Sequence, residues 1–209
     1  FKDNPKNVNI EYLQKSGSPT IIKRRFLDHI SKNKVLGVYS LNDDLLNKFD
    51  EKKFQTKLKK LIKQHDLVIV SDYGHGFITN KIAQLICKNA KFLSLNAQIN
   101  SNNIRYHSIE KYNNIHSLVL NENEIRHEIR NKSDKIENVI KSLKKKKNIR
   151  DCVVTLGKGG LVSHNESKKF NYCPSFATKI IDSVGSGDAL LATYSMCAFN
   201  KIEINLGML

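Results

Sequence analysis

The sequence of 209 residues lacks several features that would place it outside the ordinary globular proteins. It has no Trp and only 8% aromatic residues, so it offers few rings on which the bases of a nucleic acid could stack. Three Pro and ten Gly exclude a collagen-like or Pro-rich chain. No apolar run approaches the roughly 18 residues that a membrane span needs, and the polar first segment does not resemble a secretory leader. We therefore expect no membrane partner.

The cysteines and histidines lack the spacing of a metal site. The four cysteines are Cys87, Cys152, Cys173 and Cys197, and no two of them form a C-x-x-C pair. An H-E-x-x-H motif is absent because Asn131 stands where the second His would follow His127 and Glu128. We expect buried free thiols, no structural metal and a reducing, cytoplasmic compartment.

The charge is strongly positive, with 35 Lys and Arg against 20 Asp and Glu and a formal net charge of +15. Many lysines lie on the polar faces of expected helices or cluster at 144–147. A solvated, Lys-rich surface explains this pattern better than a nucleic-acid footprint does. Nucleic-acid binding is therefore kept only as an alternative, recognisable by its steep dependence on salt.

Hydrophobic residues make up 40% of the chain, enough for a sizeable core, and short apolar segments alternate with segments of helical period. We expect strands at 20–28, 35–40, 67–71, 92–95, 118–120 and 152–156, a hairpin of 160–163 with 169–173, and helices near 51–64, 82–86, 122–131, 134–147 and 186–199. This alternation predicts an α/β fold with a mostly parallel sheet flanked by helices. The first two strands have no helix between them and are expected to form a small β flap.

Ligands of such sheets bind beyond the carboxyl ends of the strands, so the loops there carry the candidate chemistry. The segment 182–188 reads D-S-V-G-S-G-D and runs into an apolar helix. Its glycines and the helix N-terminus suit a phosphoryl group, and Asp188 could accept a proton from an attacking hydroxyl. Taken alone, however, the segment is explained better by an ordinary helix start with a favourable acidic residue.

Three other loops are weaker signals. Asn121 and Glu124 could hold a hydrated Mg²⁺, although Asn-x-x-Glu is also the pattern of a helix capping box. The segment 155–160 could lie against a nucleotide or form a tight turn into the hairpin. Asp72 could meet substrate hydroxyls or satisfy the backbone of a strand-to-helix turn. No one of these loops decides the function, but their order along the chain is specific.

Taken in that order, the loops resemble the PfkB/ribokinase family of carbohydrate kinases. The segment 182–188 is similar to the family's D-T-x-G-A-G-D signature, with Ser183 in place of Thr and Ser186 in place of Ala. Asn121 and Glu124 match its N-x-x-E magnesium motif, and 155–157 matches its T-L-G nucleotide segment. The resemblance extends from about residue 20 onward and implies a ribokinase-like, Rossmann-like fold.

The resemblance also implies a role for each matching residue. Asp188 would be the catalytic base that deprotonates a sugar hydroxyl. The anion hole would comprise Gly185, Ser186 and Gly187. The nucleotide-binding residues would be Asn121, Glu124, Thr155, Gly157 and Gly160. Asn121 and Glu124 would also hold Mg²⁺ through water, and Asp182 with the Val184 carbonyl would bind a monovalent cation such as K⁺.

Within the family, the D-Y-G-x-G of 72–76 and the basic segment 22–25 look most like heptose-phosphate kinases. The substrate-binding residues implied are Asp72, Gly74, Lys23 and Arg25. Two departures count against this substrate, because His75 replaces the usual Lys and the residues 95–98 replace a D-P-K motif. The basic segment could instead be the solvent side of an edge strand.

We therefore expect ATP-dependent phosphorylation of a sugar or sugar phosphate, with heptose phosphate as one candidate. The alternatives are a nucleoside or other small-alcohol kinase of the same family, or a catalytically silent nucleotide-binding relative. We interpret 1–209 as one partial kinase domain, with 18–40 contributing to the flap, because the family's N-terminal Gly-rich signature and C-terminal end have no counterpart. By resemblance we also expect a homodimer and a nucleotidyltransferase domain fused to the full-length protein.

Overall fold

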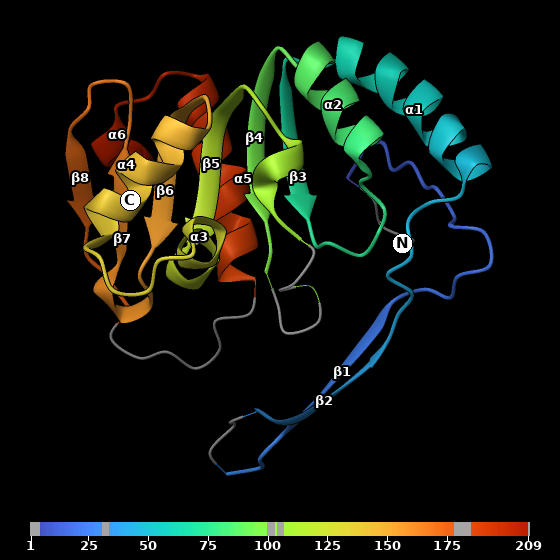
Figure 1. Ribbon diagram of the computed structural model, residues 1–209, viewed down its shortest axis with the longest axis horizontal. Helices are drawn as coiled ribbons and strands as arrows, with labels where there is room; N and C mark the ends of the chain where they lie inside the picture. Colours follow the sequence, from blue (N-terminus) through green and yellow to red (C-terminus); the bar gives the residue numbers. More distant parts are fainter. Residues whose placement is uncertain (1–4, 31–33, 100–102, 104–106, 178–184, 209) are drawn as a thin grey trace.

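A computed structural model describes residues 5–30, 34–99, 103, 107–177 and 185–208. A six-stranded sheet forms the body of the molecule, and a separate two-stranded sheet projects from it (Figure 1). The strands are β1 (Ile22–Leu27), β2 (Lys34–Ser40), β3 (Leu67–Asp72), β4 (Phe92–Ala97), β5 (Ile115–Asn121), β6 (Ile149–Thr155), β7 (Leu161–His164) and β8 (Phe170–Cys173). The helices are α1 (Lys48–Lys63), α2 (Asn80–Asn89), α3 (Glu122–Ile129), α4 (Ile136–Lys146), α5 (Ser186–Phe199) and α6 (Ile204–Gly207), with short 3₁₀ turns η1 (Ile109–Lys111) and η2 (Gly157–Gly159).

The large sheet is mostly parallel, as predicted. Strands β3 to β6 pair in parallel, and β7 and β8 add to them antiparallel in the order β3-β4-β5-β6-β7-β8. The predicted hairpin is the β7–β8 pair. Parallel strands need crossover connections, and α2 and the α3–α4 pair provide two of them. The predicted α/β fold with a small N-terminal flap is confirmed.

Successive residues of the buried strands point to opposite faces of the sheet, and each face has its own core. Leu118 of β5 packs in the cluster that includes Ile82 of α2 and Ile140 of α4. Val119, the next residue, packs in a second cluster with Leu191 of α5. Helices α1 to α4 therefore cover one face, and α5 and α6 cover the other (Figure 1).

Several elements begin earlier than the sequence pattern predicts. Strand β5 begins at Ile115 because His116 and Ser117 continue the strand although they are polar, and Ser117 is fully buried. Helix α1 begins at Lys48 because the side chain of Asn47 caps it by accepting a hydrogen bond from the Asp50 amide, at 2.8 Å. The short α6 was not predicted.

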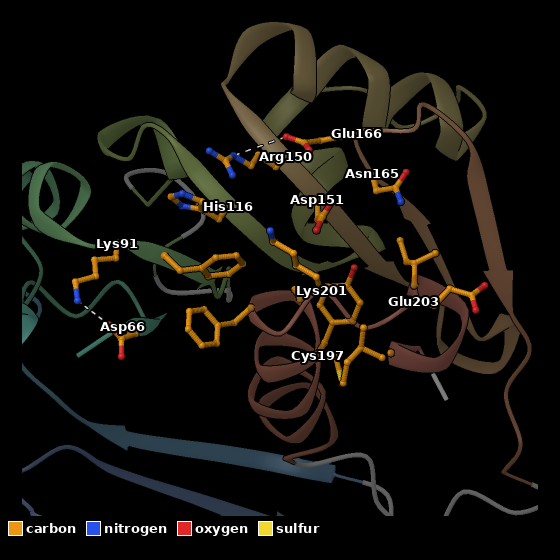
Figure 2. A pocket seen from close by; sticks show the side chains of 17 residues that line it. Asp66, Lys91, His116, Arg150, Asp151, Asn165, Glu166, Cys197, Lys201 and Glu203 are labelled. Atoms are coloured by element: carbon orange, nitrogen blue, oxygen red, sulfur yellow. Dashed lines mark hydrogen bonds and ion pairs between the residues drawn. The ribbon is translucent and has the colours of Figure 1, made fainter.

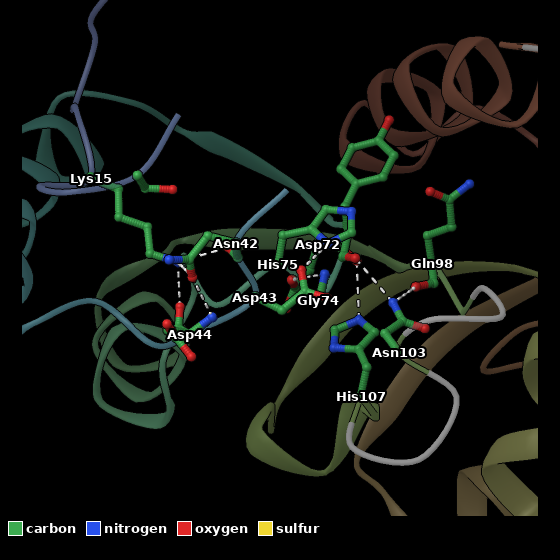
Figure 3. A network of polar contacts seen from close by, with 12 residues as sticks. Lys15, Asn42, Asp43, Asp44, Asp72, Gly74, His75, Gln98, Asn103 and His107 are labelled. Carbon is green, nitrogen blue, oxygen red and sulfur yellow. Dashed lines mark hydrogen bonds and ion pairs between the residues drawn. The ribbon is translucent and has the colours of Figure 1, made fainter. Parts of the chain in front are cut away.

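The flap is held to the body at its base. Its strands pair antiparallel, and every residue of β1 is exposed. Beyond β2, Lys15 donates a hydrogen bond to the Asn42 carbonyl at 2.9 Å, and His75 Nδ1 lies 2.6 Å from Asp43 Oδ1 (Figure 3). These contacts join the end of the flap to the N-terminal segment and to the loop that follows β3.

Asp72, the last residue of β3, lies in a buried polar cluster. Its carboxylate accepts hydrogen bonds from Tyr112 Oη at 2.6 Å and from the Gly74 amide at 3.0 Å, and Lys111 Nζ lies 2.7 Å away. Burial would raise the pKa of Asp72, but the charges of Lys111 and His107 and the hydrogen bonds of Lys111 and Tyr112 outweigh it and hold the pKa below its usual value. The cluster therefore contains a carboxylate that stays ionised inside the fold.

Lys111→Met should destabilise the chain strongly, because it leaves the buried Asp72 carboxylate without its cation. The expected loss in unfolding free energy is about 3–5 kcal/mol, measured by urea denaturation. The control is Lys91→Met, since Lys91 pairs with Asp66 at the same 2.7 Å distance but both side chains are exposed. Comparable losses in the two variants would contradict this account of the cluster.

Asp72 should also contribute to acid unfolding. Because its pKa is lower in the folded chain than in the unfolded one, its stabilisation is complete above about pH 4 and is lost as the pH falls through the folded value. Asp72→Asn should be less stable at neutral pH and should show a flatter decline of stability below about pH 4. A decline as steep as that of the unmodified chain would count against this assignment.

Candidate active site

A cavity of about 770 Å³ opens at the carboxyl ends of the parallel strands. Its walls come from the ends of β5 and β6, the first turn of α5, the loop after β3 and strand β1 of the flap. Most of the predicted site residues line it: Lys23, Arg25, Asn121, Glu124, Thr155, Gly157, Gly185, Ser186, Gly187 and Asp188. The fold thus brings together motifs that are far apart in the sequence.

The first turn of α5 presents an open backbone to this cavity. Gly185 is the N-cap residue, with φ of +85°, a left-handed conformation that favours glycine. Because Gly185 has no side chain, no side-chain cap covers this helix end, and the partial positive charge of the helix N-terminus faces the cavity. A Cβ atom at Gly185 or Gly187 would meet no heavy atom of the described residues within 4 Å, so none of those residues fills the space beside this turn.

Asp188 lies exposed on the same turn and faces Tyr73. The Tyr73 hydroxyl donates a hydrogen bond to Asp188 Oδ1 at 3.0 Å, and Lys23 Nζ of the flap lies 5.5 Å from the centre of the Tyr73 ring. Burial raises the pKa of Tyr73, a side-chain hydrogen bond with Ser71 partly opposes this, and the contact with Asp188 raises the pKa further. Sequence reasoning did not single out Tyr73, although it stands inside the D-Y-G segment that drew attention to Asp72.

Asn121 and Glu124 form a helix capping box, which was one of the two interpretations that the Asn-x-x-Glu pattern allowed. Asn121 Oδ1 accepts from the Glu124 amide, and Glu124 Oε2 accepts from the Asn121 amide, both at 2.8 Å. Burial raises the pKa of Glu124, although hydrogen bonds from the Asn121 and Ile99 amides partly oppose it. Both residues also line the cavity beside Asn96 and Gln98, so amide and carboxylate oxygens, the ligands of a hard cation, gather there.

Three predicted site residues do not line the cavity. Asp72 is only 3% exposed, and its carboxylate is paired with Lys111 and Tyr112. Its buried position does not fit the predicted direct contact with a substrate. At Gly160 a Cβ would lie 2.0 Å from the Cys173 carbonyl oxygen, which points to close packing in the hairpin instead. Gly74 contributes to the turn after β3. Asp182 and Val184, the expected cation ligands, lie outside the described residues.

A second cavity, of about 790 Å³, lies at the opposite, amino ends of the strands (Figure 2). Its charged side chains are partly compensated, since Lys91 pairs with Asp66 at 2.7 Å and Arg150 with Glu166 at 3.7 Å. Because α/β sheets bind ligands at the carboxyl ends of their strands, the first cavity is the better candidate.

The described residues contain no group of three or more His, Cys, Asp and Glu side chains that could hold a metal ion. All four cysteines are free, as expected; Cys152 and Cys173 are buried, whereas Cys87 and Cys197 are only half-buried. Among the helices in the described part of the chain, none is long and apolar enough to cross a membrane.

The model of the pfkB family of carbohydrate kinases matches residues 4–198, which is most of the chain. The chain belongs to this family. The resemblance inferred from the ordered motifs is thereby confirmed. The match includes the flap, the parallel sheet and most of α5.

Relatives and solved structures agree with this assignment. The bifunctional protein HldE of Campylobacter jejuni (strain RM1221) is 28% identical over 206 residues, 95% of this chain and 42% of the relative. That of Aliarcobacter butzleri is 28% identical over 179 residues, 84% of this chain and 36% of the relative. The chain therefore spans less than half the length of these relatives.

The fold is shared with solved sugar kinases. Phosphofructokinase-2 of Escherichia coli in complex with potassium matches with a TM-score of 0.66 at 10% identity, over 83% of this chain and 57% of the other. The Arabidopsis thaliana ribokinase complexed with ribose and ATP matches with a TM-score of 0.64 at 15% identity, over 92% of this chain and 60% of the other. These TM-scores show a common fold, and at such low identities the likeness shows the fold alone.

Proposed function

We propose that this chain is the kinase domain of an enzyme that transfers a phosphoryl group from ATP to a hydroxyl of a sugar or sugar phosphate. The observation that carries the proposal is that one cavity contains a carboxylate, Asp188, beside the N-terminus of α5 and the Asn121–Glu124 pair. Membership of the pfkB family supports a carbohydrate as the acceptor.

In this proposal Asp188 is the general base. It takes the proton of the acceptor hydroxyl while the hydroxyl oxygen bonds to the γ-phosphorus and the bond to the bridging β–γ oxygen breaks. The first-turn amides of α5, around Gly185, Ser186 and Gly187, stabilise the negative charge on the transferring oxygens. Phosphoryl transfer depends chiefly on such positioning and charge stabilisation.

The nucleotide would lie along the ends of β5 and β6. Thr155 and Gly157 line the cavity, and in the described part of the chain no heavy atom lies within 4 Å of a Cβ placed at Gly157, which supports contact of this backbone with the nucleotide. Asn121 and Glu124 would hold Mg²⁺ through water, where the ion neutralises phosphate charge. The ribokinase neighbour that contains ATP supports the nucleotide, and the neighbour that contains potassium supports a K⁺ site at Asp182 and Val184.

The acceptor would enter between this edge and the flap. Lys23 and Arg25 of β1 line the cavity and carry the charge that a sugar phosphate requires, and heptose phosphate is the specific substrate we propose. The relatives named bifunctional support a second, nucleotidyltransferase domain in the full-length protein. We also propose a homodimer and a cytoplasmic location, the latter supported by the four free cysteines.

Asp188→Asn should lower phosphoryl transfer by about 10²–10⁴-fold, the usual contribution of a general base, while the unfolding free energy falls by at most about 1 kcal/mol, the contribution of a carboxylate in the first turn of a helix. Transfer from Mg·ATP would be measured with a panel of acceptors that contains heptose phosphate, fructose phosphate and a nucleoside. Full activity of Asp188→Asn would refute the assigned base. A nucleoside as the best acceptor would replace the sugar phosphate by the alternative substrate class.

Asn121→Ala should weaken Mg·ATP binding measured by calorimetry. The matched control is Asn47→Ala, because Asn47 caps α1 in the same manner but does not line the cavity. Each variant should lose about 1 kcal/mol of stability, whereas only Asn121→Ala should lose affinity. Equal affinities would mean that Asn121 acts as a helix cap alone. If the folded, unmodified chain binds no Mg·ATP, either segments outside this chain are needed for binding or the chain is a silent relative, and the same measurement on a longer chain decides between the two.

A further inference from the structure

Tyr73 links three parts of the cavity that come from distant positions in the chain. It lies on the loop after β3, its hydroxyl contacts Asp188 of α5 at 3.0 Å, and its ring lies near Lys23 of the flap. The two residues of the hydrogen bond are 115 positions apart in the sequence. All three side chains line the same cavity.

The backbone on either side of Tyr73 is held by polar contacts that are buried or partly buried (Figure 3). The Asp72 carboxylate accepts from the Gly74 amide at 3.0 Å, and the Asp72 carbonyl accepts from His107 Nε2 at 3.1 Å. The Tyr73 carbonyl accepts from Asn103 Nδ2 at 3.0 Å. Gly74 has φ of +69°, and a Cβ there would lie 2.6 Å from Asn103 Nδ2. These contacts fix the peptide from which the phenol projects.

Asp188 has a different environment. It lies exposed on the first turn of α5, where a carboxylate on a short side chain can adopt several rotamers. The Tyr73 hydroxyl donates a hydrogen bond to Oδ1, and the other carboxylate oxygen, Oδ2, can accept the proton of the acceptor hydroxyl. A hydrogen bond to an ionised carboxylate is stronger than one between neutral groups, so the phenol can hold this carboxylate in place.

We propose that Tyr73 is a positioning residue, whose hydroxyl holds the Asp188 carboxylate in the orientation that accepts the proton of the acceptor. The Lys23 ammonium keeps the Tyr73 ring in place from the side of the flap, through a cation–π contact. This inference rests on the proposed kinase function. It also gives Asp72 a role that fits its burial, since Asp72 fixes the loop that carries Tyr73 and need not touch the substrate.

Tyr73→Phe tests the proposal, because it removes the hydroxyl and keeps the ring. We expect kcat to fall about tenfold or more, as for the loss of a hydrogen bond to a charged group, with unchanged KM for ATP and for the acceptor. The matched control is Tyr172→Phe, since Tyr172 also donates to a carboxylate, that of Glu137, but lies away from the cavity. Tyr172→Phe should leave kcat unchanged. An unchanged kcat in Tyr73→Phe would overturn the proposal.

A second measurement, by NMR, detects the contact between Tyr73 and Asp188 without requiring turnover. In protein labelled with ¹³C at tyrosine Cζ, the Tyr73 resonance is identified by its loss in Tyr73→Phe. Asp188→Asn should shift this resonance and leave that of Tyr172 in place. An unshifted Tyr73 resonance would overturn the proposal even if kcat had fallen. If the unmodified chain transfers no phosphoryl group, the kinase assignment fails, while a shifted resonance would still support the contact between Tyr73 and Asp188.

Discussion

The parallel pairing of β5 with β6 is the constraint on which the candidate site depends. Its register sets Leu118 beside Cys152 and Asn121 beside Thr155, so the strands end at the same level and their last side chains lie at one edge. Val119 and Val153 point to the face of the sheet opposite to that of Leu118 and Cys152. There they form a core with Leu191 and Tyr194 of α5. A slip of one residue would exchange the two faces, and α5 would lose the surface on which it packs. The same pairing therefore places both the edge proposed to bind the nucleotide and the helix that carries Asp188.

Most of the sheet and of the cavity could be predicted from the sequence, because their signals are local. The apolar segment of β3 and the glycines before α5 are visible without knowledge of any distant residue. The start of β5 was not predictable, because His116 and Ser117 are polar and resemble loop residues, although in the folded sheet Ser117 is fully buried and His116 partly buried. The periodicity of hydrophobic residues indicates which side chains are buried, but it cannot detect a strand residue that is polar and nevertheless buried.

The polar contacts of the site were least predictable, because each joins residues far apart in the chain. From its own segment, Asp72 is predicted to bind substrate. Its place in the interior becomes visible only through contacts such as that with Tyr112, 40 positions away. Likewise, nothing in a D-Y-G sequence says that the tyrosine meets the carboxylate of Asp188. Motifs identify residues that face a ligand, whereas the residues that hold them in place are found only once the chain is folded.

The strand order has a consequence for how the molecule assembles. In the large sheet the spatial order equals the order along the chain, so each strand pairs with the strand that precedes it. Such a sheet can extend from one edge as synthesis proceeds, because each new strand needs only one connection to the strand just before it to close. Helix α5 is different, since it packs across β3, β4 and β5 and must return over strands made long before it. The turn that bears Asp188 is thus the last part of the cavity to be put in place.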